Sequence, residues 1–191
     1  MRETLIIRAK NEKECLAMKP ILKIILIILC LTGCKTPQPA LEDDDFYALI
    51  NLLFQKSEFK EVAIFHKTIN EGRVDINDQL KFEKLNANFP VLGGRIDFEK
   101  IMTQEDLDFV KSQTEDLGER KIDTQFFNFP ARLVKKNDES IIHYYSEPFF
   151  TRGRNYAFIF SKTGSGGESF MVFEKVDGQW KFLCSVALIF V

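Results

Sequence analysis

The densest group of chemically versatile side chains lies between residues 143 and 156, around one predicted strand–turn–strand unit. It combines an imidazole, a carboxylate, two guanidinium groups and a phenol, on His143, Glu147, Arg152, Arg154 and Tyr156. Arginines on both sides of a turn glycine can hold a carboxylate or a phosphate through paired hydrogen bonds. These five are therefore candidate ligand-binding residues for a small anionic ligand. The alternative is that both arginines are solvated turn residues that pair with Glu147 or other acids.

The remaining patterns predict no catalytic residue, no metal and no cofactor. A metal site needs clustered His, Cys or carboxylate ligands, and the only histidines of the chain, His66 and His143, are far apart. The glycine cluster Gly164–Gly167 lacks the Lys-Ser/Thr of a phosphate loop and precedes a predicted strand, so we interpret it as a hairpin loop. Acid–base pairs assembled across a fold leave no spacing in the sequence, so an envelope hydrolase with a site near 143–156 stays open.

The elements that must position these residues are strands. Turn signals divide the C-terminal part of the chain into five predicted strands, at residues 131–136, 141–149, 156–162, 168–176 and 179–190. Short connections predict an antiparallel meander of about five strands. Pro148 cannot donate to a ladder and marks an edge or a bulge. Asp177-Gly178 predicts a two-residue hairpin turn. Alternation places three aromatic residues on one face of their strand, Tyr156, Phe158 and Phe160. It likewise places four residues on one face of the last strand, Trp180, Phe182, Cys184 and Val186.

Two helices are predicted before these strands. Apolar residues at helical spacing cover 46–54 after an acidic run, in which one Asp can cap the helix. Thr103 with Asp106 forms a capping-box pattern that begins a helix ending near Gly118. Between them, residues 58–100 are hard to interpret, and Gly93-Gly94 suggests a short hairpin. The expected class is α+β, with N-terminal helices packed on the C-terminal sheet in a single domain, 42–191.

A lysine-flanked apolar run lies near the N-terminus, at Ile24–Leu31, and is too short for a bilayer-spanning helix of about 20 residues. It ends in Leu31-Thr32-Gly33-Cys34, which resembles the lipobox of bacterial lipoproteins. The resemblance implies that 1–33 is a signal region and that acyl chains, palmitate included, attach at Cys34 as the membrane anchor. Residues 34–41 would then be the lipidated cysteine and a tether. Met18 is an alternative start of translation.

The C-terminal part loosely resembles small uncharacterised lipoproteins of Bacteroidetes, through Tyr145–Phe150, Asn155–Phe158 and Glu174–Lys181. That resemblance carries no established activity. The Gly-x-Trp-Lys ending also resembles cone-shaped sheet domains of the nuclear-transport-factor type. Lys35 follows the cysteine where an Asp would resemble an inner-membrane retention signal, and this favours the outer membrane.

Composition narrows the function classes. A net charge of −2 excludes the strongly basic footprint of a nucleic-acid binder. We expect a lipid-anchored, non-enzymatic binding or structural module of the cell envelope, with an envelope protein or a small anionic ligand as partner. An immunity or inhibitor protein is a further alternative, with an acidic patch at Asp106, Glu115 and Asp116.

Phenylalanine is unusually frequent, with 19 residues in the chain and none before residue 35. Cys184 is the only cysteine after Cys34, so no disulfide can form within that part. We expect Cys184 to be a small core residue. We expect the phenylalanines to supply the core that an exported domain without disulfides needs.

Overall fold

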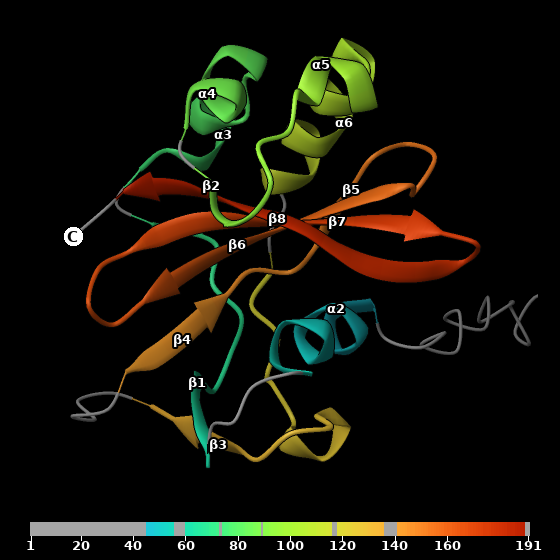
Figure 1. Cartoon of the computed structure of the whole chain (residues 1–191). Helices are drawn as coiled ribbons and strands as arrows, with labels where there is room; N and C mark the ends of the chain where they lie inside the picture. Colours follow the sequence, from blue (N-terminus) through green and yellow to red (C-terminus); the bar gives the residue numbers. More distant parts are fainter. Residues whose placement is uncertain are drawn as a thin grey trace, which may run out of the picture. The chain divides into compact units, whose positions relative to one another are not determined.

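The computed structural model describes residues 45–55, 60–72, 74–88, 90–115, 118–135 and 141–189. All of them belong to one compact unit, Asp43–Val191, in which helices pack on a mixed sheet (Figure 1). The expected α+β class is confirmed. Within these ranges, every helix is too short or too polar to cross a bilayer.

The sheet has eight strands in the order β2-β8-β7-β6-β4-β1-β3, and β5 pairs with β6 outside this path. Their bounds are β1 (Val62–Phe65), β2 (Pro90–Gly93), β3 (Ala131–Val134), β4 (Ile142–Tyr145), β5 (Phe149–Phe150), β6 (Tyr156–Thr163), β7 (Glu168–Val176) and β8 (Gln179–Ile189). Pairing is antiparallel except that β1 runs parallel to both β3 and β4.

The prediction of a five-stranded antiparallel meander is therefore only partly right. β6, β7 and β8 form such a meander, but β3 and β4 are separated by β1. Strand β1 lies in the region 58–100. Its four residues are too few for alternation to identify a strand there. The predicted strand 141–149 is also broken. The Ser146 hydroxyl accepts from the Phe160 amide at 3.0 Å and donates to the Glu147 carbonyl at 2.7 Å, just before Pro148.

The two hairpin predictions in this meander are confirmed. Asp177 and Gly178 have φ values of 52° and 78°, so both central residues of the β7–β8 turn lie in the left-handed region that a primed turn requires. The glycine cluster Gly164–Gly167 connects the antiparallel strands β6 and β7. It is a hairpin loop, as expected.

Strand β8 departs from simple alternation at one point. Phe182 pairs with Phe173 and Cys184 pairs with Val172, so Leu183 is an extra residue, a β-bulge. Because the bulge shifts the side-chain period by one residue, Trp180 and Phe182 pack on one face of the sheet and Cys184 on the other. The prediction that these residues share a face is therefore wrong. The prediction for β6 is right, since Phe158 and Phe160 share a cluster with Tyr156 packed against it.

The helices are α2 (Asp45–Phe54), α3 (Ile76–Gln79), α4 (Phe82–Ala87), α5 (Phe98–Ile101) and α6 (Gln104–Thr114), with a 3-10 turn η1 (Thr124–Phe126). The helix expected at 46–54 is confirmed as α2. The capping box of Thr103 and Asp106 is also confirmed, although α6 ends before Gly118. The hairpin suggested around Gly93-Gly94 is wrong, because β2 pairs with the distant β8 and α5 follows.

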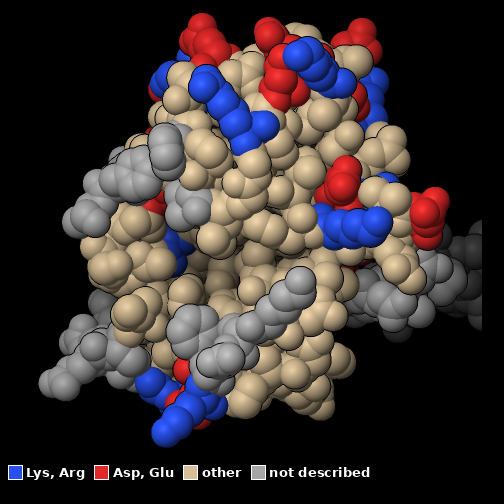
Figure 2. Space-filling view, in the orientation of Figure 1, with Lys and Arg blue, Asp and Glu red and all other residues tan. Residues whose placement is uncertain are grey.

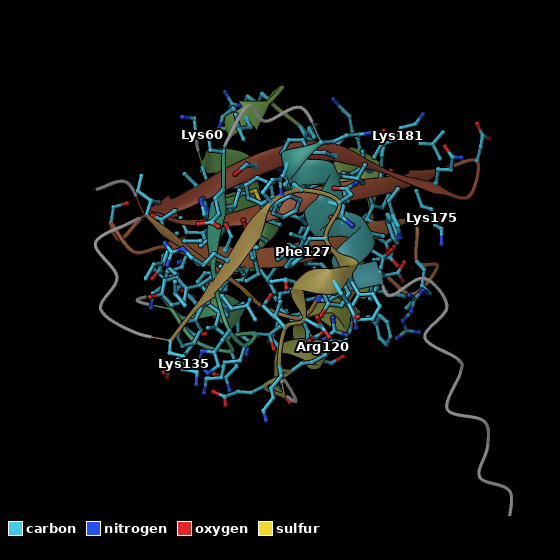
Figure 3. All side chains as sticks on the ribbon, turned by 90° about the horizontal axis from the view of Figure 1, so that it is seen from below. Lys60, Arg120, Phe127, Lys135, Lys175 and Lys181 are labelled. Atoms are coloured by element: carbon cyan, nitrogen blue, oxygen red, sulfur yellow. The ribbon has the colours of Figure 1, made fainter. Side chains whose placement is uncertain are left out.

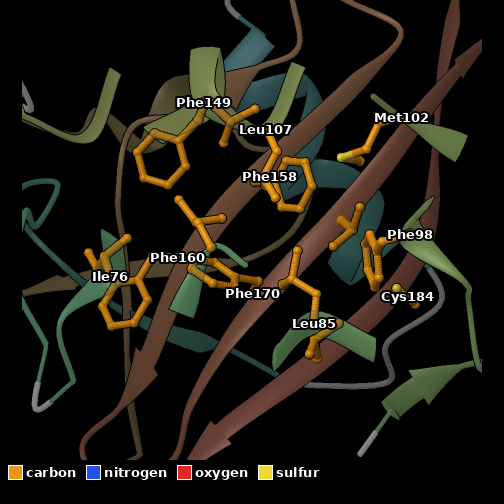
Figure 4. Packing of buried hydrophobic residues seen from close by; sticks show 14 residues of the cluster. Ile76, Leu85, Phe98, Met102, Leu107, Phe149, Phe158, Phe160, Phe170 and Cys184 are labelled. Atoms are coloured by element: carbon orange, nitrogen blue, oxygen red, sulfur yellow. The ribbon is translucent and has the colours of Figure 1, made fainter. Parts of the chain in front are cut away.

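Each face of the sheet carries its own core. The helical-face cluster joins side chains of α3–α6 to side chains of the sheet, and Figure 4 shows their packing; it comprises Ile76, Leu80, Leu85, Phe98, Met102, Leu107, Val110, Phe149, Phe158, Phe160, Phe170, Val172, Cys184 and Val186. The α2-face cluster lies on the other side; it comprises Phe46, Tyr47, Leu49, Ile50, Phe54, Val62, Ile64, Ile122, Tyr145, Ala157, Ile159 and Phe173. Phenylalanines thus contribute to both cores, as expected.

Candidate functional site

The five candidate ligand-binding residues do not form one site. Strand β4 carries His143, the β4–β5 connection carries Glu147, and the turn from β5 to β6 carries Arg152 and Arg154, with Tyr156 opening β6. The structure gives these side chains separate partners from separate elements. Three local arrangements result.

The first arrangement surrounds His143, which faces α2. Its ring is stacked on Tyr145 with centroids 6.2 Å apart, and it meets Phe54 edge-on at 5.7 Å. Burial lowers the pKa of His143 below 6.5, because the charged imidazolium would lose its hydration there. Burial likewise raises the pKa of Tyr145. His143 is the half-buried strand histidine that the alternation of β4 suggests, in an aromatic environment that favours its neutral form.

The second arrangement is an ion pair on the α2 face. Arg120 Nε lies 3.1 Å from Glu147 Oε1, and both side chains are partly exposed. The Arg120 guanidinium also lies over two rings of α2, 4.8 Å from the centroid of Phe46 and 5.2 Å from that of Tyr47. The carboxylate of Glu147 therefore holds Arg120 against the helix. The sequence could not predict this ion pair, because Glu147 and Arg120 are far apart in the chain.

The third arrangement lies where α2 begins. Asp45 Oδ1 accepts from the Trp180 indole at 2.7 Å, and Asp45 Oδ2 accepts from Arg154. The Arg154 guanidinium is 4.1 Å from the centroid of Phe150. Asp45, one acidic residue of the run in which a cap was expected, instead contacts Trp180 of β8 and Arg154 of the turn from β5 to β6. Residues 42–44, the rest of that run, lie outside the described part.

The other two candidates point elsewhere. The Arg152 guanidinium lies 5.6 Å from the ring centroid of Phe109 on α6, so the two turn arginines do not converge. Tyr156 is half-buried against the helical-face cluster. An anion held between Arg152 and Arg154 would have to compete with Phe109 for one guanidinium and with Asp45 for the other.

Sequence reasoning also missed a buried carboxylate. Glu168 is only 2% exposed and accepts from the Val74 amide at 3.3 Å. A Cβ added at Gly72 would lie 2.4 Å from the Phe160 ring and 2.8 Å from Glu168 Oε2, so this loop fits closely over the carboxylate. Glu168 shares the helical face with Phe170, and only the alternation of β7 could have indicated its burial.

One small cavity lies beside β8, lined by residues that include Asn86, Asn88, Arg95 and Cys184. Its volume is about 10 Å³, room for a single water. Cys184 is 1% exposed and belongs to the core, as expected. Burial raises the pKa of its thiol to about 11, which disfavours the reactive thiolate. Among the described residues, no three His, Cys, Asp or Glu side chains gather closely enough to hold a metal ion.

The immunity or inhibitor alternative expects an acidic patch at α6, but acidic and basic side chains lie close together in this region. Asp106 accepts from the backbone and hydroxyl of Thr103 in the capping box, and Glu115 follows the end of the helix. Asp116 lies outside the described residues. In Figure 2, acidic and basic side chains are mixed over the helices at the top of the view. The predicted lipidation site Cys34, with the whole signal region and tether, also lies outside the described residues.

No protein-family profile, curated protein or solved structure matches this chain.

Proposed function

We propose that this protein is a lipoprotein of the bacterial cell envelope, anchored by acyl chains on Cys34. The observation that carries the proposal is the sequence Leu31-Thr32-Gly33-Cys34 directly after the lysine-flanked apolar run. Small residues before the cysteine allow the backbone to enter a signal peptidase, and the cysteine sulfur receives the diacylglycerol. Two or three acyl chains together hold a protein firmly on a bilayer, whereas a single short chain does so only marginally.

The folded unit is a non-enzymatic binding or structural module in this proposal. Its support is that the candidate polar residues serve the packing of the unit: Glu147 holds Arg120, Arg154 holds Asp45, and Arg152 lies over Phe109. An envelope hydrolase would need such groups to converge on one reacting centre. An envelope protein remains the proposed partner, and the outer membrane the proposed location.

Radioactive or alkyne-tagged palmitate in a bacterial host tests the anchor. The wild-type protein should incorporate the label, and Cys34→Ala should abolish incorporation and retain the uncleaved precursor. Cys30→Ala is the matched control, because Cys30 lies only four residues before Cys34, inside the apolar run. Equal labelling of wild type and Cys34→Ala would refute the proposal, and so would loss of label in both variants.

A further inference from the structure

A group of aromatic side chains from η1 and the residues after it packs against α2. The rings of Tyr47 and Phe126 lie 4.9 Å apart, and those of Tyr47 and Phe127 lie 5.2 Å apart. Phe129 continues the group, at 5.0 Å from Phe127 and 4.5 Å from Phe54. We name the three surface residues Phe126, Phe127 and Phe129 the aromatic face. Phe126 is 54% exposed, and the other two are half-buried.

The backbone of this aromatic segment is held in place by hydrogen bonds to α2. The Asn51 amide donates to the Phe126 carbonyl at 3.1 Å, and Asn51 Oδ1 accepts from the Asn128 amide at 2.9 Å. The Tyr47 hydroxyl accepts from the Asp123 amide at 2.8 Å. Backbone groups of Asp123, Phe126 and Asn128 are therefore bonded to side chains of α2, while the ring of Phe126 is left in water beside exposed polar side chains. Phe126 is one of the most exposed large apolar side chains among the described residues, and here it lies against two further rings at Tyr47 and Phe127.

Several lysines lie on the same side of the unit as the aromatic face, together with the exposed Asp123 (Figure 3). In Figure 3, Phe127 lies near the centre, and the labels of Lys60, Lys135 and Lys175 lie toward the edge of the unit. Lys181 is also labelled, but it pairs with Glu174, and the alternation of β8 turns both side chains to the other face of the sheet. Acidic residues occur here too, but three of them are in ion pairs. These pairs are Lys67–Glu119, Arg132–Glu61 and Arg154–Asp45. Aromatic side chains with lysines on the same side match the chemistry of an anionic lipid surface.

The chain enters the unit beside this surface. Asp45, the first described residue, is two positions before Tyr47, whose ring contacts Phe126. Ten residues separate Cys34 from Asp45. Fully extended, they reach at most about 40 Å, so an acylated Cys34 would keep the start of α2 close to the bilayer. The end of α2 that is nearest to Cys34 in sequence is therefore the end whose Tyr47 ring contacts the exposed Phe126 of η1.

We propose that the aromatic face docks on the phospholipid headgroup region of the membrane in which Cys34 is anchored. The inference rests on the proposed lipid anchor and adds the orientation of the folded unit. Phe126 enters the headgroup region, and the lysines on this side contact anionic phosphates. Glu42, Asp43 and Asp44 add negative charge to the tether. The docking is therefore assigned first to the aromatic side chains and only second to the lysines.

The test uses full-length lipidated protein, with acylation verified by mass, reconstituted into phosphatidylethanolamine–phosphatidylglycerol vesicles. A nitroxide is attached at Phe126→Cys, and a second label position is Asn128→Cys on the same exposed segment. The matched control is Phe109→Cys, an exposed phenylalanine on α6 that is 38% accessible. Collision rates with oxygen and with a water-soluble nickel chelate report whether each label is in lipid or in water.

We expect the ratio of oxygen to nickel collisions to be several-fold higher at positions 126 and 128 than at 109. Equal ratios at all three positions would overturn the docking. A label at 126 that stays in water on pure lipid vesicles, but is shielded in whole envelopes, would identify a protein partner and would also overturn it. Absence of an acyl group at Cys34 would contradict the proposed lipid anchor instead. The mass measurement therefore distinguishes failure of the anchor from failure of the docking.

Discussion

The two faces of the sheet are covered in different ways. Four helices close the helical face, and its cluster consists of aliphatic and phenylalanine side chains with one methionine and one buried thiol. A single helix covers the opposite face, assisted by the segment 120–129, with its exposed Phe126. The imidazole of His143, the Arg120–Glu147 pair and the Asp45 contacts are all directed to this second face.

This difference indicates a division of roles. A fully covered apolar face contributes to the free energy of folding through the area it removes from water. The α2 face buries its own cluster as completely, and in addition it carries polar contacts and one exposed ring that a partner can reach. Substitutions in the buried clusters should act mainly on stability. Substitutions at the polar contacts and at Phe126 on the α2 face should act through single hydrogen bonds, protonation and binding.

The largest effect is expected from truncation in the helical-face cluster. Phe158 has no exposed surface and contacts the rings of Phe98 and Phe170. Phe158→Ala should lower the free energy of unfolding by about 3–5 kcal/mol, through lost transfer energy and the remaining cavity. Urea denaturation measures it. Phe126→Ala is the comparison on the α2 face and should cost less than about 0.5 kcal/mol. Similar losses for both variants would break the proposed division.

Added volume on the helical face should also be costly. Gly72→Ala places a methyl group against Phe160 and Glu168, and such overpacking costs about 1–3 kcal/mol. Gly94→Ala is the matched control, because a Cβ there meets no atom within 4 Å. This control should be neutral or stabilise the fold by up to about 1 kcal/mol, through the lower entropy of the unfolded chain. If Gly72→Ala is as stable as Gly94→Ala, the loop over Glu168 is not tightly packed.

A smaller effect is expected from one hydrogen bond on the α2 face. Tyr47→Phe removes the hydroxyl that accepts from the Asp123 amide, which should cost about 1 kcal/mol. Amide hydrogen exchange at Asp123 should accelerate, while exchange in β6 and β7 should change only with global stability. Tyr156→Phe is the control, because its described hydrogen bonds involve backbone atoms. Unchanged exchange at Asp123 would show that Tyr47 does not hold the segment.

The sequence predicted those structural elements that depend only on residues close together in the chain. The Asp177-Gly178 turn, the Thr103 capping box and the helical spacing at 46–54 are each complete within a few residues. The face of Cys184 could not be predicted, because one extra residue at Leu183 reverses the alternation and carries no signal of its own. Strand β1 has only four residues and is recognisable by its two parallel neighbours, which come much later in the chain.

The candidate site shows the same limit more strongly. Both arginines, the histidine and the glutamate could be singled out by type, but their partners could not. Asp45 is 109 residues from Arg154 and 135 from Trp180. Proximity in sequence grouped side chains that have separate partners in the fold: Phe54 for His143, Arg120 for Glu147, Phe109 for Arg152 and Asp45 for Arg154. The hydrogen bonds that fix them depend on the sheet register, which residue types do not encode.

The smallest expected effect is a pH dependence located on the α2 face. Burial holds the pKa of His143 below 6.5 in the folded protein, while the unfolded chain keeps the ordinary value. Above the unfolded value neither state binds this proton, and stability is unaffected. As pH falls below it, the unfolded state gains the proton first, so the free energy of unfolding decreases, by at most about 1.4 kcal/mol per pH unit for one proton. When urea denaturation is measured between pH 5 and 8, His143→Gln should remove this part of the decrease in the free energy of unfolding, whereas His66→Gln should retain it.

Amide hydrogen exchange should locate the same response. The helical-face cluster contains no histidine, so exchange should become faster in α2 rather than in α6 as the pH falls. An identical pH profile in wild type and His143→Gln would show that burial of this imidazole does not distinguish the two faces.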